Sequence, residues 1–239
     1  MMVACHDITS TRPLALTRLL TLGIINPKNW RDVGIGHTSS LRVKMTEYWV
    51  VAASYAMGLF PSAYFAGRLV KGVDIRKIGD RNAGAANVYR NVSHVAGIAV
   101  LATDIGKGAL AILLASAVAS QSIVFLCGLA VVAGHNWPIF LRFKGGRGLA
   151  TTIGVLLALL PIPMAILSAA GILSLWKTGN LVVTGVIMFA PLPLLAWLLG
   201  GSGGLILYSV VLLCFAGIMH LVTTKHLSSA QKKEALRWR

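Results

Sequence analysis

The residues best suited to chemistry gather in two basic, glycine-rich stretches that interrupt long apolar runs. The first, GVDIRKIGDRNAGAANVYR at residues 72–90, combines arginines and a lysine with glycines and two asparagines. The second, RFKGGRG, covers residues 142–148. Glycine lets a backbone approach an anion and turn its N–H groups toward it, while arginine supplies charge and forked donors. Two such loops predict one site for a phosphate-bearing ligand.

The overall composition places these loops in a membrane protein. The chain has 239 residues, of which 56% are hydrophobic and 12% charged, and its mean hydropathy is +0.76. An ordinary soluble domain carries roughly twice that charged fraction. The formal net charge is +15. A nucleic-acid-binding module would explain the charge but not the apolar runs. We therefore expect basic loops that face anionic lipid and cytoplasm, and no nucleic-acid partner.

The apolar segments predict the number of membrane spans. A span needs about 20 apolar residues. Residues 149–176 admit either one kinked span or two short ones divided at Pro161. The basic regions 68–90, 142–147 and 220–239 share one side of the membrane only if an even number of spans separates consecutive ones. We therefore predict an all-α, polytopic integral membrane protein with about seven transmembrane helices, near residues 50–70, 92–118, 123–132, 149–160, 162–176, 181–199 and 204–220.

The two ends of the chain differ from this membrane region. Residues 1–44 have mixed polarity and six basic side chains, and no apolar run there has spanning length. We interpret them as a disordered extension or a misassigned start, with Met45 as the better start. The membrane domain then covers residues 45–227, and residues 228–239 form a basic cytoplasmic tail that flanks the last span.

A pair of opposite charges lies inside the second predicted span, at Asp104 and Lys107 of DIGKG. A charge in mid-membrane costs about 2.5–3.5 kcal/mol on insertion scales. Because the two side chains are three positions apart on one helical face, they should pair or face a polar cavity. A structural ion pair and a part in the substrate site are both open. The same holds for His135, which is either a site residue or a boundary histidine bonded to backbone.

In their order and spacing, VDIRKIGDRNAGAANVYR, DIGKG and GHNWPIFLRFKGGRGLATTIG resemble the bacterial acyl-phosphate-dependent glycerol-3-phosphate acyltransferase family. The resemblance covers about Met45 to Leu227, and GHxxPxFxxFKGG followed by GxAT is its most specific part. It implies a multi-pass protein of the bacterial inner membrane with an active site on the cytoplasmic face. The implied reaction moves a fatty acyl group from acyl phosphate to the 1-hydroxyl of glycerol 3-phosphate, giving lysophosphatidate and phosphate for phospholipid synthesis. No metal or other cofactor is implied, and the partners are these substrates and membrane lipids.

The resemblance carries over unevenly to single residues. The family typically reads G-S-G-N-x-G-A-T-N-x-x-R in the first loop, where Asp80 here replaces the serine and Ala86 the threonine. Arg147 stands where the family has lysine, and Leu59 replaces a serine of the first span. The implied catalytic residues are His220, Arg90 and Arg147. The implied substrate-binding residues are Asp80, Asn82, Gly84, Asn87, Lys107, His135, Lys144, Gly145, Gly146, Gly148, Thr151, Thr184 and Thr223.

Of these, Thr184 would correspond to a serine in a later polar loop, and Thr223 to the asparagine of a His-x-x-Asn pair that begins at His220. Because several donors to phosphate are changed, a catalytically weak paralogue that binds a lipid phosphate or acyl phosphate is the alternative. A small anion transporter is the third hypothesis. It is disfavoured because its glycines would be expected at the membrane midplane, whereas here they flank the apolar runs.

Overall fold

The structure is a computed structural model and describes residues 47–238, so the predicted extension at residues 1–44 lies outside the described residues. Within the described range the regular structure is helical, apart from one isolated bridge between Asn180 and Arg237. This confirms the all-α prediction. The elements are α2 (Tyr48–Gly58), α3 (Ser62–Lys71), η3 (Ile75–Lys77), α4 (Ala85–Asn91), α5 (His94–Val118), α6 (Gln121–Asn136), η4 (Ile139–Leu141), α7 (Leu149–Leu159), α8 (Pro161–Thr178), α9 (Leu181–Phe189), α10 (Leu192–Leu198), α11 (Gly203–Thr224) and α12 (Ser229–Ala235).

Five helical stretches of the described chain are long and apolar enough to cross a membrane: Tyr48–Lys71, His94–Val118, Gln121–Leu141, Leu181–Leu198 and Gly203–Thr224. The two remaining predicted segments correspond to α7 and α8. With 11 residues, α7 is about 16 Å long, which is short for a hydrocarbon layer of about 30 Å. The number of seven crossings therefore stays a prediction.

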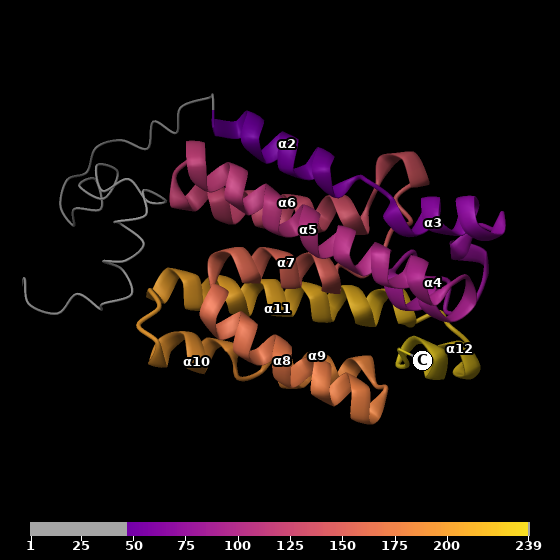
Figure 1. The fold of residues 1–239 in the computed structure, drawn as a ribbon. Helices are drawn as coiled ribbons and strands as arrows, with labels where there is room; N and C mark the ends of the chain where they lie inside the picture. Colours follow the sequence, from indigo (N-terminus) through magenta and orange to yellow (C-terminus); the bar gives the residue numbers. More distant parts are fainter. Residues whose placement is uncertain (1–46, 239) are drawn as a thin grey trace, which may run out of the picture. The chain divides into compact units, whose positions relative to one another are not determined.

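Prolines set the interruptions of these stretches. Leu160 has non-helical backbone angles (φ −131°, ψ 64°), and Pro161 opens α8, where its missing N–H needs no partner. In Figure 1, α8 folds back from the end of α7, so residues 149–176 form two helices instead of one kinked helix. Pro61 likewise separates α2 from α3, and Pro191 separates α9 from α10.

Small residues allow the central helices to pack closely. A Cβ atom added to Gly58 of α2 would lie 2.3 Å from the carbonyl oxygen of Val131 in α6. A Cβ atom on Gly108 of α5 would lie 2.3 Å from the carbonyl oxygen of Thr151 in α7. Close backbone approach through glycine is typical of helices that associate in membranes. These contacts hold α2 against α6 and α5 against α7, and the second loop of the site joins α6 to α7.

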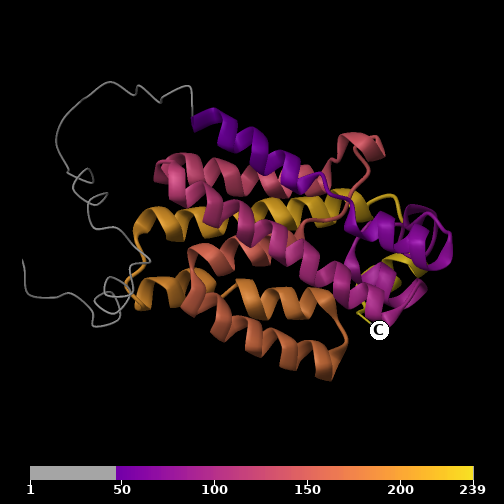
Figure 2. The ribbon, with the colours of Figure 1, turned by 45° about the horizontal axis from the view of Figure 1, so that its top comes forward.

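The polar loops gather at one end of the helix bundle, which we call the loop end: residues 72–93, 137–148 and 225–238. Figures 1 and 2 show α4, the η4 turn and α12 at this same end. The basic regions that were predicted to share a side therefore do lie together. The η4 turn also exposes apolar side chains there, with exposed fractions of 53% for Ile139, 80% for Phe140 and 59% for Phe143.

Candidate active site

Two arginines from different loops converge on one carboxylate at the loop end. Nη1 of Arg147 lies 3.0 Å from Oδ2 of Asp80, and Nη2 of Arg90 lies 3.4 Å from the same oxygen. The arginine side chains are each 10% exposed and that of Asp80 is 2% exposed. We call Asp80, Arg90 and Arg147 the arginine site. Two guanidinium groups around one buried anion form a position that phosphate oxygens can also occupy.

Asn87 gives the first loop its shape. Its side chain is fully buried, and Nδ2 lies within hydrogen-bond distance of the carbonyl oxygens of Ile75, Ile78 and Asn82, at 3.1, 3.1 and 2.9 Å. Gly79 turns at φ +57°, and a Cβ atom there would lie 2.2 Å from Oδ1 of Asn87. The sequence assigned Asn87 to the substrate. In the structure its amide holds the loop that presents Asp80.

Arg76 belongs to the same loop as Asp80, but its side chain binds Asp74. Its Nε and Nη2 donate to the two carboxylate oxygens of Asp74 at 2.9 and 2.7 Å, and Nη1 donates to the carbonyl of Leu141 at 2.9 Å. These bonds tie the first loop to the η4 turn. The hydrogen bond from Arg76 lowers the pKa of Asp74, and the same bond raises the pKa of Arg76.

Helix α11 supplies the third side of the arginine site. Nε of Arg147 donates to Oγ1 of Thr223 at 3.2 Å. His220 lies one turn before Thr223 in α11 and is half-buried. Its side chain is close enough to Arg147 and Asp80 to interact electrostatically with both. Burial lowers the pKa of Arg147, while the neighbouring Asp80 carboxylate opposes that shift. The structure thus brings together His220, Thr223 and the two arginines from widely separated parts of the chain.

A second polar group lies deeper among the helices, formed by Ser62, Asp104, Lys107 and His135, and we call it the ion cluster. Oδ1 of Asp104 accepts from Oγ of Ser62 at 2.7 Å and from Nζ of Lys107 at 2.8 Å. Nζ of Lys107 also lies 2.8 Å from Nδ1 of His135 and donates to the carbonyl of Phe60 at 3.2 Å. The predicted pairing of Asp104 with Lys107 is confirmed.

The ion cluster defines the protonation of His135. A lysine ammonium only donates hydrogen bonds, so Nδ1 of His135 must accept from it, and a neutral ring then carries its proton on Nε2. This Nε2 faces the second loop, because a Cβ atom added to Gly146 would lie 2.1 Å from it. Sequence reasoning missed Ser62. Its signal is a serine directly after Pro61, at the point where the first span is broken.

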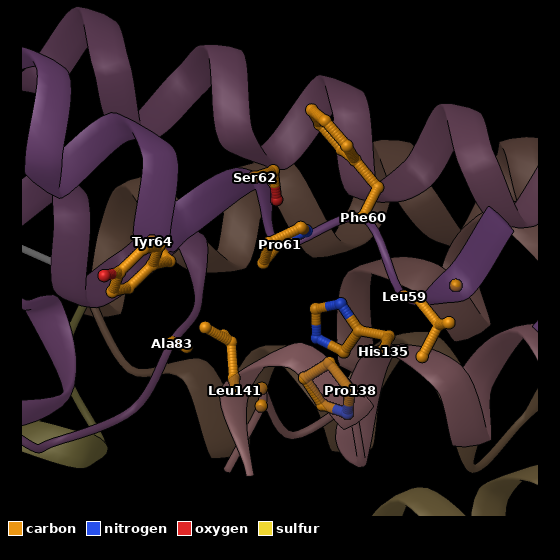
Figure 3. A pocket seen from close by; sticks show the side chains of 12 residues that line it. Leu59, Phe60, Pro61, Ser62, Tyr64, Ala83, His135, Pro138 and Leu141 are labelled. Atoms are coloured by element: carbon orange, nitrogen blue, oxygen red, sulfur yellow. The ribbon is translucent and has the colours of Figure 1, made fainter. Parts of the chain in front are cut away.

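A small pocket opens beside His135. Figure 3 shows the imidazole of His135 between Pro61 of the first span and Pro138 of the η4 turn. Neither arginine of the arginine site lines this pocket. Gly146 and Ala83 do line it, and they are the chain neighbours of Arg147 and Asn82. The pocket and the arginine site are therefore built from the same two loops.

The glycines of the second loop have a different role from the expected one. The N–H of Gly145 donates to the carbonyl of Asn136, and the N–H of Gly146 donates to that of His135, both at 3.1 Å. These two N–H groups are thus occupied within the chain, although the sequence suggested that they bind phosphate. The absence of side chains matters instead, because it leaves room for the His135 ring. Gly148, at φ +82°, turns the chain into α7.

The remaining predicted residues are dispersed. Lys144 is exposed, and Gly84 is the N-cap residue of α4. Just before this helix, the N–H of Asn82 donates to Oδ1 of Asp80 at 3.3 Å. Thr151 is fully buried in α7, and Thr184 is buried in α9 instead of lying in a polar loop. Within residues 47–238, neither threonine hydroxyl has a hydrogen-bond partner.

Comparisons with known proteins agree with this arrangement. The family model described as glycerol-3-phosphate acyltransferase matches residues 48–233. Glycerol-3-phosphate acyltransferase 4 of Dehalococcoides mccartyi is 45% identical over 176 residues, covering 73% of this chain and 95% of that protein. Glycerol-3-phosphate acyltransferase 2 of the same organism is 40% identical over 178 residues, covering 74% of this chain and 85% of that protein.

The fold is similar to that of a solved integral membrane enzyme. The crystal structure of the glycerol 3-phosphate acyltransferase PlsY (YgiH), in its glycerol 3-phosphate form, superposes with a TM-score of 0.65 at 25% identity. The superposition covers 79% of this chain and 98% of that one. The lysophosphatidic acid form gives a TM-score of 0.66. The sequence match and the shared fold together show that this integral membrane chain belongs to the glycerol-3-phosphate acyltransferase family.

Proposed function

We propose that this chain transfers a fatty acyl group from acyl phosphate to the 1-hydroxyl of glycerol 3-phosphate at the cytoplasmic face of a bacterial inner membrane. The observation that carries the proposal is the convergence of Arg90 and Arg147 on one anionic position. Membership of the family supports the reaction type. The gathering of basic residues at the loop end supports the cytoplasmic orientation, because positively charged loops stay on that side.

The protein mainly has to position the two substrates and stabilise the developing negative charge. It need not activate the acyl group, since an acyl phosphate already contains a good leaving group. The acceptor hydroxyl oxygen attacks the acyl carbonyl carbon, and the bond from that carbon to the phosphate oxygen breaks. The phosphate leaves with the bonding electron pair, and the hydroxyl proton passes to His220. Arg90 and Arg147 hold phosphate oxygens and so bring the reacting atoms together. Lysophosphatidate and inorganic phosphate result.

The ion cluster prepares a donor beside this site. Lys107 fixes the orientation of His135, so that its Nε2–H faces the pocket lined by the two loops. A donor held by a buried partner needs no reorganisation when negative charge develops nearby. His135 is therefore assigned to the substrate, while Asp104 and Ser62 position Lys107 and act through it.

The alternative of a weak paralogue has one observation in its favour, which is that Asp80 already takes the place of an anion between the arginines. One assay distinguishes a catalytic protein from one that only binds its substrates. Purified protein in lipid is given acyl phosphate and glycerol 3-phosphate, and released phosphate and lysophosphatidate are both measured. Stoichiometric formation of the two products supports the acyltransferase, whereas substrate binding without product supports the paralogue.

The arginine variants test the site itself. Arg90→Ala and Arg147→Ala should each lower kcat/KM by about 10²–10³-fold, because each removes a charged donor that holds a phosphate. Lys77→Ala is the matched control, because Lys77 is an exposed cation of the same loop. Lys71 is less suitable, since its Nζ donates to the carbonyl of Asn91 at 2.8 Å. Equal activities of Arg90→Ala and Lys77→Ala would contradict the assignment.

A further inference from the structure

The chain after α11 forms an ordered segment at the loop end, residues 228–238, which we call the C-terminal strap. It begins with a capping box, in which Oγ of Ser228 accepts from the N–H of Gln231 and the Gln231 side chain accepts from the N–H of Ser228. Figures 1 and 2 show α12 and the chain end close to α4. The family match ends at residue 233, so the last part of the strap lies beyond it.

The strap is held by contacts with two other elements. The N–H of Trp238 donates to the carbonyl of Gly179 at 2.8 Å, and the N–H of Leu181 donates to the carbonyl of Leu236 at 2.7 Å. The Trp238 ring packs on the ring of Tyr89 in α4, with 4.8 Å between centroids. Aromatic pairs of this geometry add stability beyond the burial of their area. The tryptophan thus anchors the strap to the helix that carries Arg90.

The strap also binds the side chain of Arg90 directly. Nη1 of Arg90 donates to the carbonyl of Arg237, and Nε lies 3.6 Å from Oε1 of Glu234. The same Glu234 oxygen accepts from Nδ2 of Asn91 at 2.9 Å. Nε and Nη2 of Arg90 are buried and form no hydrogen bond within the described chain. Nε faces the Glu234 carboxylate of the strap and Nη2 faces the Asp80 carboxylate at 3.4 Å, so the guanidinium is held between the strap and the first loop.

We propose that the C-terminal strap is a positioning element of the arginine site, which holds Arg90 by Nη1 and Nε so that its Nη2 is directed at the anionic position that Asp80 occupies and that a substrate phosphate can take. An arginine side chain has many rotamers, and a ligand that must order it binds more weakly. The strap removes that cost before the ligand arrives. The nature of the ligand rests on the proposed function, whereas the positioning of Arg90 rests on the contacts described above.

The test removes the anchor without changing charge. Trp238→Ala should release the strap and raise KM for glycerol 3-phosphate about tenfold, while kcat changes less than about twofold. The reason is that a clamp on a phosphate that does not react stabilises ground and transition states equally. Trp238→Phe, which keeps the aromatic contact, should restore the parental KM. Lys233→Gln is the control, because it changes an exposed side chain of the same strap.

A double variant shows whether the effect passes through Arg90. In an Arg90→Ala background, Trp238→Ala should cause no further rise in KM, because two residues that act as one unit are not additive. A second variant, ending the chain after Lys233, should reproduce the rise in KM. Thermal unfolding and gel filtration verify that each variant is folded.

Several results would overturn the proposal. An unchanged or lower KM in Trp238→Ala would show that the strap is a bystander or competes with phosphate, and additive effects with Arg90→Ala would show another route. Equal loss of kcat and thermal stability without a KM change would indicate a purely structural strap. A parental protein that forms no product contradicts the proposed function instead. In that case stabilisation of the folded parent and of Trp238→Ala by glycerol 3-phosphate still measures the strap.

Discussion

Asp80 is the residue that most alters the expected chemistry of the site. Without an anion, two buried guanidinium groups would face each other with no compensating charge, which is strongly destabilising. Asp80 supplies that charge, at 3.0 Å from Arg147 and 3.4 Å from Arg90. The same carboxylate repels an incoming phosphate and competes for its donors. We therefore expect Asp80 to stabilise the folded site and to weaken its affinity for phosphate.

Replacing the Asp80 carboxylate should raise the affinity for phosphate and lower the stability of the folded site. Asp80→Ser, alone or with Ala86→Thr, should raise acyltransferase activity or affinity for glycerol 3-phosphate, and it should lower thermal stability in the absence of substrate. Product formation is measured over a range of glycerol 3-phosphate concentrations at fixed ionic strength, because salt screens the arginines. Loss of a robust parental activity would show instead that Asp80 orients Arg90 or recognises the acceptor.

Between elements, the ion cluster connects three helices at a depth where charges are costly. Ser62 begins α3, Asp104 and Lys107 belong to α5, and His135 lies near the end of α6. Each group has a partner of opposite charge or a complementary hydrogen-bonding atom. Because α6 leads directly into the second loop, this connection also positions Arg147. The Asp104–Lys107 pair therefore ties together the helices that lead to the site.

Removing one charge of the Asp104–Lys107 pair should lower the stability of the protein more than replacing both residues by apolar ones. Asp104→Asn leaves Lys107 without a countercharge and should destabilise the protein by about 3–5 kcal/mol. The double variant Asp104→Leu with Lys107→Met removes both charges and should be more stable than Asp104→Asn. Thermal unfolding in one detergent compares the two variants. The same stability for both would show that the countercharge is unimportant.

The contact between the first loop and the η4 turn should make stability sensitive to acid. The hydrogen bond from Arg76 lowers the pKa of Asp74 in the folded protein. Its contribution is therefore fully present above the ordinary carboxyl pKa of about 3.9 and is lost as the pH falls through the lower folded value. Asp74→Asn should weaken the fall in melting temperature below about pH 4. Glu47→Gln, at the opposite end of the bundle, is the control, and an identical pH profile for Asp74→Asn and parent would contradict the argument.

At the scale of the whole molecule, the described fold and the family match nearly coincide. The match begins at residue 48, and residues 1–44 contain no run of spanning length. A protein that starts at Met45 should therefore insert and fold as well as the full chain. The folded membrane fraction and its activity are compared after expression at equal levels. Absence of that fraction from the shortened protein would show that the first 44 residues are needed.

The sequence predicted the features that depend on local composition. Apolar runs located the helices, Pro161 marked the division of residues 149–176, and the spacing of Asp104 and Lys107 predicted their pairing. Contacts over long sequence distances could not be predicted in this way. Nothing local connects Asp80 with Arg147, which is 67 positions later, or Arg90 with Arg237, 147 positions later.

Local pattern also does not reveal which polar groups bond to the backbone of the same chain. Asn87 and Gly146 both looked like parts of a phosphate cradle, but their N–H groups bind carbonyls of the same chain. The tail looked like a charged flank, because a positive segment after a span has that meaning by default. Its docking depends on Trp238 and on main-chain bonds, which composition does not reveal.

The exposed apolar side chains at the η4 turn bear on whether the bulk or the membrane-surface concentration of substrate controls the rate. In this turn and the residues directly after it, the exposed Ile139, Phe140 and Phe143 lie beside Arg142 and Lys144 in the sequence, a combination of apolar and cationic groups typical of a membrane surface. An acyl phosphate has the same division, with its chain in the lipid and its phosphate among the headgroups. With acyl phosphate as the proposed donor, we expect the two to meet within a surface layer and the rate to follow the mole fraction of acyl phosphate in the bilayer. Dilution with inert phospholipid should slow the reaction even when the bulk concentration is constant.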